Sequence, residues 1–243
     1  MQSPKDWEWL FNGRYLGFTV TFTRDISPEG LLSKYGADLA AAHMLSFSDM
    51  HSVLQPGLSG AVLRVGDFKD WSFAIEAFGI KGMDATLLED LSRDSETFAV
   101  HSGANALDLM EHWRAGRPLE KFEPGNPMTL RASGSHPFWD ATERLRKAYP
   151  GVMYVVAAMG SIGEHIGGSL SRAVDDGELL SVALPQFSLP PGSFGTPLPL
   201  VHPPEGNPSL GRRLPGSIRP DEIPPPYPTP AASPRPWPGK PGP

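Results

Sequence analysis

Proline is distributed so unevenly along this chain that it limits which residues can form a packed domain. Of the 28 prolines, 20 lie within residues 184–243, a stretch that also holds seven glycines. Proline removes a backbone hydrogen-bond donor, and a segment rich in proline and glycine buries too little apolar surface to offset the entropy lost on ordering. The composition therefore predicts one folded domain over residues 1–183 and a disordered tail over residues 184–243.

Composition and charge exclude several classes of function. The 243 residues contain no cysteine, which excludes a disulfide framework, a thiolate nucleophile and a cysteine-ligated metal site. The formal net charge is -6, whereas phosphate binding needs clustered Lys and Arg, so we expect no nucleic-acid partner. Residues 1–183 hold 16 basic and 24 acidic residues, a net charge of -8, and residues 184–243 hold five and three, a net charge of +2.

The sequence offers no obvious export signal or membrane span. The first seven residues lack the basic region, the apolar stretch and the cleavage site of a secretory signal. Residues 152–166 are the most apolar segment, but they include Glu164 and His165 and are shorter than the ~18–20 residues that a span needs. We therefore expect a cytoplasmic protein without a membrane partner.

The clearest local pattern lies at residues 16–36. Apolar residues alternate with Gly and Thr over residues 16–23, which is the period-two pattern of a strand with one buried face. Ser27, Pro28 and Glu29 follow in the order of a helix start, with a hydroxyl cap, a proline in the first turn and an acid near the positive end of the helix dipole. Gly36 is a suitable stop, so a strand followed by a helix is predicted.

The remaining patterns predict the fold class. Strands are predicted at residues 61–65 and 71–77 with a turn at 66–67, at 97–101, and as a second hairpin at 107–113 and 119–122; a helix is predicted at 135–149. Residues 152–170 also have helical spacing, but five glycines leave open whether residues 152–176 form one helix or two. Strands that precede helices, with hairpins between the strands, predict an α+β domain with a mainly antiparallel sheet covered by helices on one face.

Short motifs occur in a fixed order within residues 7–150. They are FTVTFTRDISPEGLLSKYGAD at residues 18–38, WSFAIEAFGIKG at residues 71–82, the pair LS at residues 91–92 and FEP at residues 122–124. In order and spacing they resemble an uncharacterised actinobacterial family of small domains of unknown function. The resemblance implies a shared fold and a bacterial cytoplasmic setting, and it brings no catalytic residues. The proline-rich tail departs from the short end usual in that family.

Common motifs of catalysis and cofactor binding are absent from the sequence. The chain has no HExxH, GxGxxG, GxxxxGK[ST], GxSxG or EF-hand pattern, which disfavours nucleotide-dependent, zincin and α/β-hydrolase chemistry. Two of the seven histidines, His112 and His165, directly follow a glutamate, but neighbouring residues point to different faces of a helix or strand. We therefore expect no metal site and no cofactor.

Glu76 is the most informative charged residue because it lies inside an apolar strand pattern. If the face that carries Trp71 is the core, Glu76 lies on the solvent-exposed or helix-covered face. If both faces are covered, the carboxylate needs a partner, since an unpaired buried charge is costly, and Arg24 and Arg64 are the natural partners. Such a pair either has a structural role or lines a functional cleft.

Four residues are the candidate binding or cleft residues: Arg24, Asp25, Trp71 and Glu76. Arg24 and Asp25 lie where the predicted strand meets the capped helix, a kind of junction that exposes side chains and free amides to ligands in many folds. A plain surface turn is the alternative. In the tail, residues 224–227 have the PPxY order that WW domains bind as polyproline II, with a spacer or no selected role as alternatives.

Two functions of different classes stay open. A non-catalytic protein-binding module, regulatory or of the immunity type, fits the acidic charge and the lack of a catalytic motif. The alternative is an enzyme whose carboxylate and histidine groups, such as Asp25, Glu76 and His101, come together from distant loops. A pocket in which Glu76 or a histidine faces a second ionisable group would favour the enzyme.

Overall fold

The computed structural model of the chain describes residues 3–54, 60–104, 107–132 and 134–185. The strands are β1 (Phe18–Arg24), β2 (His43–Leu45), β3 (Ala61–Phe68), β4 (Trp71–Ala77), β5 (Glu96–Ser102), β6 (Asp108–Arg114), β7 (Arg117–Glu123), β8 (Asn126–Ala132) and β9 (Leu179–Leu184). The α-helices are α1 (Pro28–Lys34), α2 (Phe47–Val53), α3 (Ala85–Ser92), α4 (Pro137–Ala148), α5 (Tyr154–Ile166) and α6 (Arg172–Asp176). Three 3-10 helices accompany them: η1 (Pro4–Leu10), η2 (Leu39–Ala41) and η3 (Lys81–Met83).

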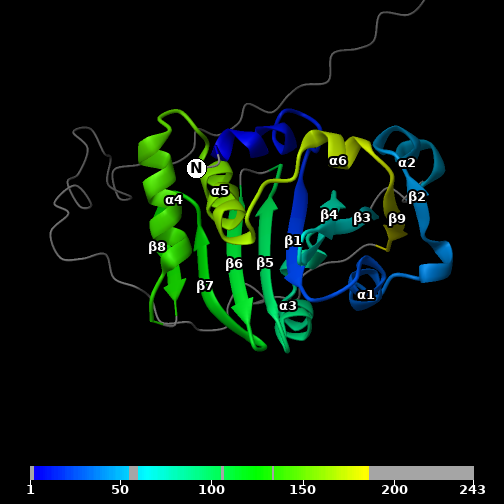
Figure 1. Cartoon of the computed structure of the whole chain (residues 1–243), viewed down its shortest axis with the longest axis horizontal. Helices are drawn as coiled ribbons and strands as arrows, with labels where there is room; N and C mark the ends of the chain where they lie inside the picture. Colours follow the sequence, from blue (N-terminus) through cyan, green and yellow to red (C-terminus); the bar gives the residue numbers. More distant parts are fainter. Residues whose placement is uncertain (1–2, 55–59, 105–106, 133, 186–243) are drawn as a thin grey trace, which may run out of the picture. The chain divides into compact units, whose positions relative to one another are not determined.

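The strands form one sheet in the order β2-β9-β3-β4-β1-β5-β6-β7-β8, and each neighbouring pair is antiparallel. In Figure 1, α5 crosses in front of β6 with α4 beside it. The predicted α+β fold with a mainly antiparallel sheet is therefore confirmed. From residue 186 onward, the predicted tail lies outside the described residues, and so does the PPxY motif.

The predicted strand and helix at residues 16–36 are confirmed as β1 and α1. The Ser27 hydroxyl accepts a hydrogen bond from the amide of Gly30 at 3.1 Å, as expected of a cap. Gly36 has a φ of +69°, a backbone conformation that favours glycine. The strand begins at Phe18, and Leu16 lies before it with 73% of its surface exposed.

Helices cover both faces of the sheet, so the expectation of one covered face is wrong. Phe22, Phe73 and Phe98 belong to the core on one face, where α4 and α5 pack with η1. Leu63 and Ala74 belong to the core on the other face, which α1 and α3 cover. The central strands are therefore buried on both sides.

Buried threonines explain why the alternation in β1 was misleading. Thr21 and Tyr35 place their hydroxyls 3.1 Å apart, and the hydroxyls of Thr23 and Thr97 are 3.2 Å apart. A buried hydroxyl with a hydrogen-bond partner costs little. An alternation of apolar residues with threonine therefore fits a strand that is covered on both faces as well as one that is half exposed.

Strands β3 and β4 form the predicted hairpin, but its turn follows Phe68 instead of lying at residues 66–67. Gly66 lies inside β3, opposite Phe73 in the ladder. A Cβ atom on this glycine would lie 2.8 Å from Leu179. Gly66 therefore gives room for the side chains packed against it, and the glycine was wrongly interpreted as a turn residue.

The last described residues form two helices, a point that the sequence left open, and a strand that was not predicted. Residues 152–176 contain two helices, α5 and α6; α5 ends at Ile166 and is capped by Gly167, which has a φ of +81°. Strand β9 then pairs with both β2 and β3. The residues after α4 therefore complete the sheet.

A buried ion cluster fastens α6 to the sheet. Arg64 Nη1 donates to the carboxylate Oδ1 and to the carbonyl oxygen of Asp175, both at 2.6 Å. Arg14 and Tyr15 donate to the same carboxylate. The side chains of Arg64 and Asp175 are 0% and 1% exposed. Arg64 therefore pairs with Asp175 and not with Glu76.

Candidate functional site

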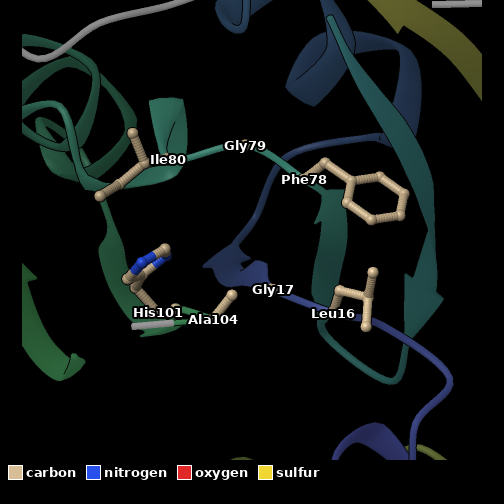
Figure 2. Close-up of a pocket in the computed structure, with 8 residues that line it drawn as sticks. Leu16, Gly17, Phe78, Gly79, Ile80, His101 and Ala104 are labelled. Carbon is tan, nitrogen blue, oxygen red and sulfur yellow. The ribbon is translucent and has the colours of Figure 1, made fainter. Parts of the chain in front are cut away.

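A pocket opens where β1 begins and where β4 and β5 end. Its volume is about 280 Å³, and it is lined by Leu16, Gly17, Phe78, Gly79, Ile80, His101, Gly103 and Ala104. Figure 2 shows the His101 ring on one side of this space and Leu16 and Phe78 on the other. We call it the His101 pocket. Apart from the imidazole, its lining side chains are apolar.

Two large apolar side chains stand exposed at the rim of the His101 pocket. Leu16 is 73% exposed and Phe78 is 54% exposed. Phe78 also has a φ of +62°, which is strained for a bulky residue, and its amide donates to the carbonyl of Gly17 at 3.0 Å. Such strain is concentrated at functional sites, where the surrounding structure maintains it. The fold thus holds the ring of Phe78 at the pocket mouth, although its exposure to water and its positive φ are both unfavourable.

A row of polar residues crosses three strands beneath the pocket. Thr19 of β1 is in register with Glu76 of β4 and with His101 of β5, so all three share one face of the sheet. The Thr19 hydroxyl donates to the carbonyl of Gly79 at 2.9 Å and lies 3.0 Å from His101 Nδ1. Because a hydroxyl has one proton and a carbonyl only accepts, Nδ1 of His101 must donate to Thr19.

Burial favours the neutral form of the His101 imidazole. It is 8% exposed, and burial lowers its pKa from 6.5, although the carbonyl of Phe18 opposes this shift. With the proton on Nδ1, the other ring nitrogen, Nε2, is an acceptor. The hydrogen bond to Thr19 fixes the orientation of the ring.

Glu76 lies buried under the pocket floor, and its predicted partners are wrong. Its Oε1 and Oε2 accept hydrogen bonds from the amides of Lys81 at 3.0 Å and Gly82 at 2.8 Å. Burial raises the pKa of Glu76, and these amides oppose the shift. Backbone donors of the η3 turn, near in sequence, take the place expected for Arg24 or Arg64. The carboxylate therefore serves to hold η3 against the sheet.

Arg24 and Asp25 lie in a different pocket at the opposite end of β1. That pocket, of about 310 Å³, is lined by Arg24, Asp25, Arg93, Asp94, Ser95, Glu96, Arg114 and Ala115. Asp25 lies six positions after Thr19, which at ~3.3 Å per strand residue is about 20 Å. Asp25 therefore cannot share a site with Glu76 and His101.

Trp71 is a core residue. It is 6% exposed, and its ring centroid lies 5.6 Å from that of Phe98 and 6.0 Å from that of His165. Of the four predicted site residues, the structure places Glu76 beneath the His101 pocket, Arg24 and Asp25 together in the second pocket, and Trp71 at neither.

The two histidines that follow glutamates share a carboxylate that belongs to neither pair. Oε1 of Glu96 lies 2.7 Å from His112 Nε2, and Oε2 lies 3.2 Å from His165 Nε2. Burial alone would raise the pKa of Glu96, but the hydrogen bonds from both imidazoles hold it well below its usual range. Within the described residues, no group of three or more His, Asp or Glu could hold a metal ion.

Sequence reasoning missed the residues that shape the His101 pocket. Leu16 was interpreted as part of the strand, Phe78 was given no role, and His101 entered only through the enzyme hypothesis. The available signal was the Phe78-Gly79 pair at the end of a long apolar strand, because glycine after an aromatic residue indicates a sharp change of chain direction.

Replacing Gly79 with alanine should disrupt the pocket floor. The added Cβ would lie 2.0 Å from Oε1 of Glu76, a buried side chain that two backbone amides hold in place. We expect the free energy of unfolding to fall by about 2–3 kcal/mol, as in overpacked cores, when measured by urea denaturation. Gly17→Ala is the matched control, since its Cβ meets nothing closer than 3.4 Å. Equal losses in both variants would contradict this account.

A comparison with known families matches residues 1–148 to a family described as a family of unknown function (DUF6461). The chain belongs to this family. The resemblance of the sequence motifs to a family of unknown function is thereby confirmed. The DUF6461 match contains every residue that lines the His101 pocket and ends with α4, so α5, α6 and β9 follow it. No curated protein and no solved structure matches the chain.

None of the helices within the described residues combines the length and the apolar character needed to cross a membrane. The longest, α5, has 13 residues, of which ten are buried against the rest of the fold.

Proposed function

We propose that this chain is a non-catalytic protein-binding module of the bacterial cytoplasm, regulatory or of the immunity type, whose His101 pocket receives an apolar side chain of its partner. The exposed Leu16 and Phe78 beside an apolar pocket carry this proposal. Exposed apolar patches mark interaction sites, and the strongest contacts of an interface are anchors that fill a pocket. At about 280 Å³ the pocket is just below the ~300–1,000 Å³ of small-molecule sites, so it suits one side chain.

The chemistry of the pocket favours one kind of anchor. The walls are apolar, and the neutral His101 ring offers Nε2 as an acceptor. Tyrosine and tryptophan combine a large apolar surface with one hydrogen-bond donor, and both are enriched at interfaces. A tyrosine or tryptophan of the partner would therefore satisfy the walls and the imidazole together.

The geometry gives less support to the enzyme alternative. Among the described lining residues, His101 alone is ionisable, whereas acid–base or nucleophilic catalysis needs further groups within reach of the substrate. Both carboxylate oxygens of Glu76 accept backbone amides, and Asp25 is about 20 Å away along β1. The three residues of that hypothesis do not form one site.

Affinity capture with matched variants tests the proposed function. The full chain is the bait, and Phe78→Asp should reduce recovery of its specific partner roughly tenfold or more, since loss of an interface hot spot costs ~2 kcal/mol. Aspartate tolerates the positive φ at this position, so the variant should fold, which circular dichroism checks.

Met128→Asp is the control for a general effect of added charge. Met128 is 53% exposed, similar to Phe78, and lies on the edge strand β8. We expect this variant to recover the partner as the unmodified chain does. If Phe78→Asp and the unmodified chain recover the same proteins in equal amounts, the pocket is not the binding site.

A further inference from the structure

Three arginines from separate parts of the chain line the second pocket, which we call the Arg24 pocket. Arg24 is the last residue of β1, Arg93 caps the end of α3 and Arg114 is the last residue of β6. The sequence does not reveal this cluster, because the three residues lie far apart along the chain. The fold therefore gathers positive charge that the order of residues keeps apart.

Ser95 joins the three backbone segments that carry these arginines. Its hydroxyl donates to the carbonyl of Arg24 at 2.6 Å, and its carbonyl accepts from the amide of Ala115 at 3.2 Å. Its own amide donates to the carbonyl of Ser92, at the end of α3, at 3.2 Å. The end of β1, the turn after α3 and the hairpin after β6 are thus linked by hydrogen bonds. A frame that is already ordered reduces the entropy cost of binding a ligand.

The guanidinium groups of the three arginines have donors available for a ligand. Arg24 Nε lies 3.8 Å from Asp25 Oδ2, and Arg93 Nη2 lies 3.4 Å from Asp90 Oδ1, with all four side chains partly open to solvent. Arg114 has no ion pair, and none of the three guanidinium groups donates a hydrogen bond, among the residues that the structure describes. Like charges around one space repel each other, and a bound anion would offset this repulsion.

Three carboxylates also line the Arg24 pocket, and one of them already has partners. Both oxygens of Glu96 are hydrogen-bonded to imidazoles, those of His112 and His165. Asp25 and Asp94 are exposed, and ionised carboxylates accept hydrogen bonds from hydroxyl groups. The pocket therefore offers cationic donors for an anion beside acceptors for hydroxyl groups of the same molecule.

We infer that the Arg24 pocket binds a small hydroxylated phosphate monoester, a compound of the sugar-phosphate class. A phosphate monoester has three terminal oxygens and a charge of about -1.5 to -2 at pH 7, which suits three guanidinium groups better than the two oxygens and single charge of a carboxylate. The volume of about 310 Å³ falls within the ~300–1,000 Å³ of small-molecule sites. This site lies at the opposite end of β1 from the His101 pocket, so its ligand is separate from the proposed protein partner.

Isothermal titration calorimetry of the full chain with glucose 6-phosphate tests this inference. Because residues 1–183 carry a net charge of -8, binding of an anion depends on the local arginines. Arg24→Gln, Arg93→Gln and Arg114→Gln should each weaken binding on the order of tenfold, the usual effect of losing a charge-assisted hydrogen bond. Arg172→Gln is the control, since this side chain on α6 is 67% exposed, similar to the 63% of Arg93, and does not line the pocket. We expect this control to bind as the unmodified chain does.

Two further probes separate the anion from the hydroxylated body. Inorganic phosphate provides the anion alone and glucose the hydroxyl groups alone. We expect glucose 6-phosphate to bind more tightly than either, and Asp94→Asn to reduce its advantage over phosphate. Equal affinities for phosphate and glucose 6-phosphate would overturn the assignment of a hydroxylated ligand. Arginine variants that bind as the unmodified chain does, or no binding of either phosphate compound at millimolar concentrations, would overturn the site itself. Phe78→Asp should leave these affinities unchanged, so failure here does not affect the proposed function.

Discussion

Replacing Asp175 with alanine is expected to lower the free energy of unfolding by roughly 3–5 kcal/mol, the usual cost of removing one partner of a buried ion pair. The side chain of Arg64 is fully buried, and without Asp175 it keeps a charge with only carbonyl oxygens around it. Arg14 and Tyr15 lose the same acceptor. Urea denaturation measures the loss, and the melting temperature should fall by about 10 °C.

Asp176→Ala is the control for this prediction. Its side chain is 50% exposed and pairs with Arg14 and Arg172 near solvent, so we expect a loss under about 1 kcal/mol. Both variants remove one negative charge, so a difference between their losses of stability reports the effect of burial. Similar losses for both would show that the cluster behaves as a surface ion pair.

Glu120→Gln is expected to remove one part of a pH-dependent loss of stability. Glu120 is fully buried and accepts the amides of Phe138 and Trp139 at the start of α4. Burial raises its pKa from 4.5 to about 7, although the two amides oppose the shift. The folded chain thus holds this proton more tightly than the unfolded chain. The resulting stabilisation is complete below pH 4.5 and is lost as the pH rises through 7.

The size of the effect follows from the same two pKa values. Between pH 4.5 and 8, the free energy of unfolding of the unmodified chain should fall by about 3 kcal/mol relative to Glu120→Gln. Urea denaturation at several pH values measures this difference. Glu123→Gln, on the same strand but partly exposed, is the control. A difference between the unmodified chain and Glu120→Gln that stays constant with pH would contradict the prediction.

Local signals in the sequence predicted the elements whose structure depends on neighbouring residues. The cap at Ser27, the hairpin of β6 and β7 and the helix α4 all follow from spacing and turn residues within a few positions. Strands β2 and β9 were not predicted because they are short and are held by pairing with residues distant in sequence. Strand β8 was also not predicted, although it pairs with the preceding strand β7. For β9, the partners in β2 and β3 lie more than 100 residues earlier.

The candidate site was predicted only in part, for a related reason. Glu76 was singled out as a carboxylate in an apolar strand, and the sequence suggested arginine side chains as its partners. Nothing in the sequence indicated that backbone amides would take that place. The amides of Lys81 and Gly82 become donors only when η3 folds back over the strand. The grouping of Leu16, Phe78 and His101 depends on strand order, which no local pattern specifies.

The position of β9 in the sheet also sets the order in which the fold can be completed. Strand β3 has one edge on β4 and the other on β9, so its second edge has no strand partner until residues 179–184 are available. A nascent chain that has emerged only as far as α5 presents that edge to other chains. Unpaired edges are templates for aggregation, and pairing over such long separations is slow. We therefore expect the edge of β3 to stay open to misassembly during synthesis until β9 has emerged from the ribosome.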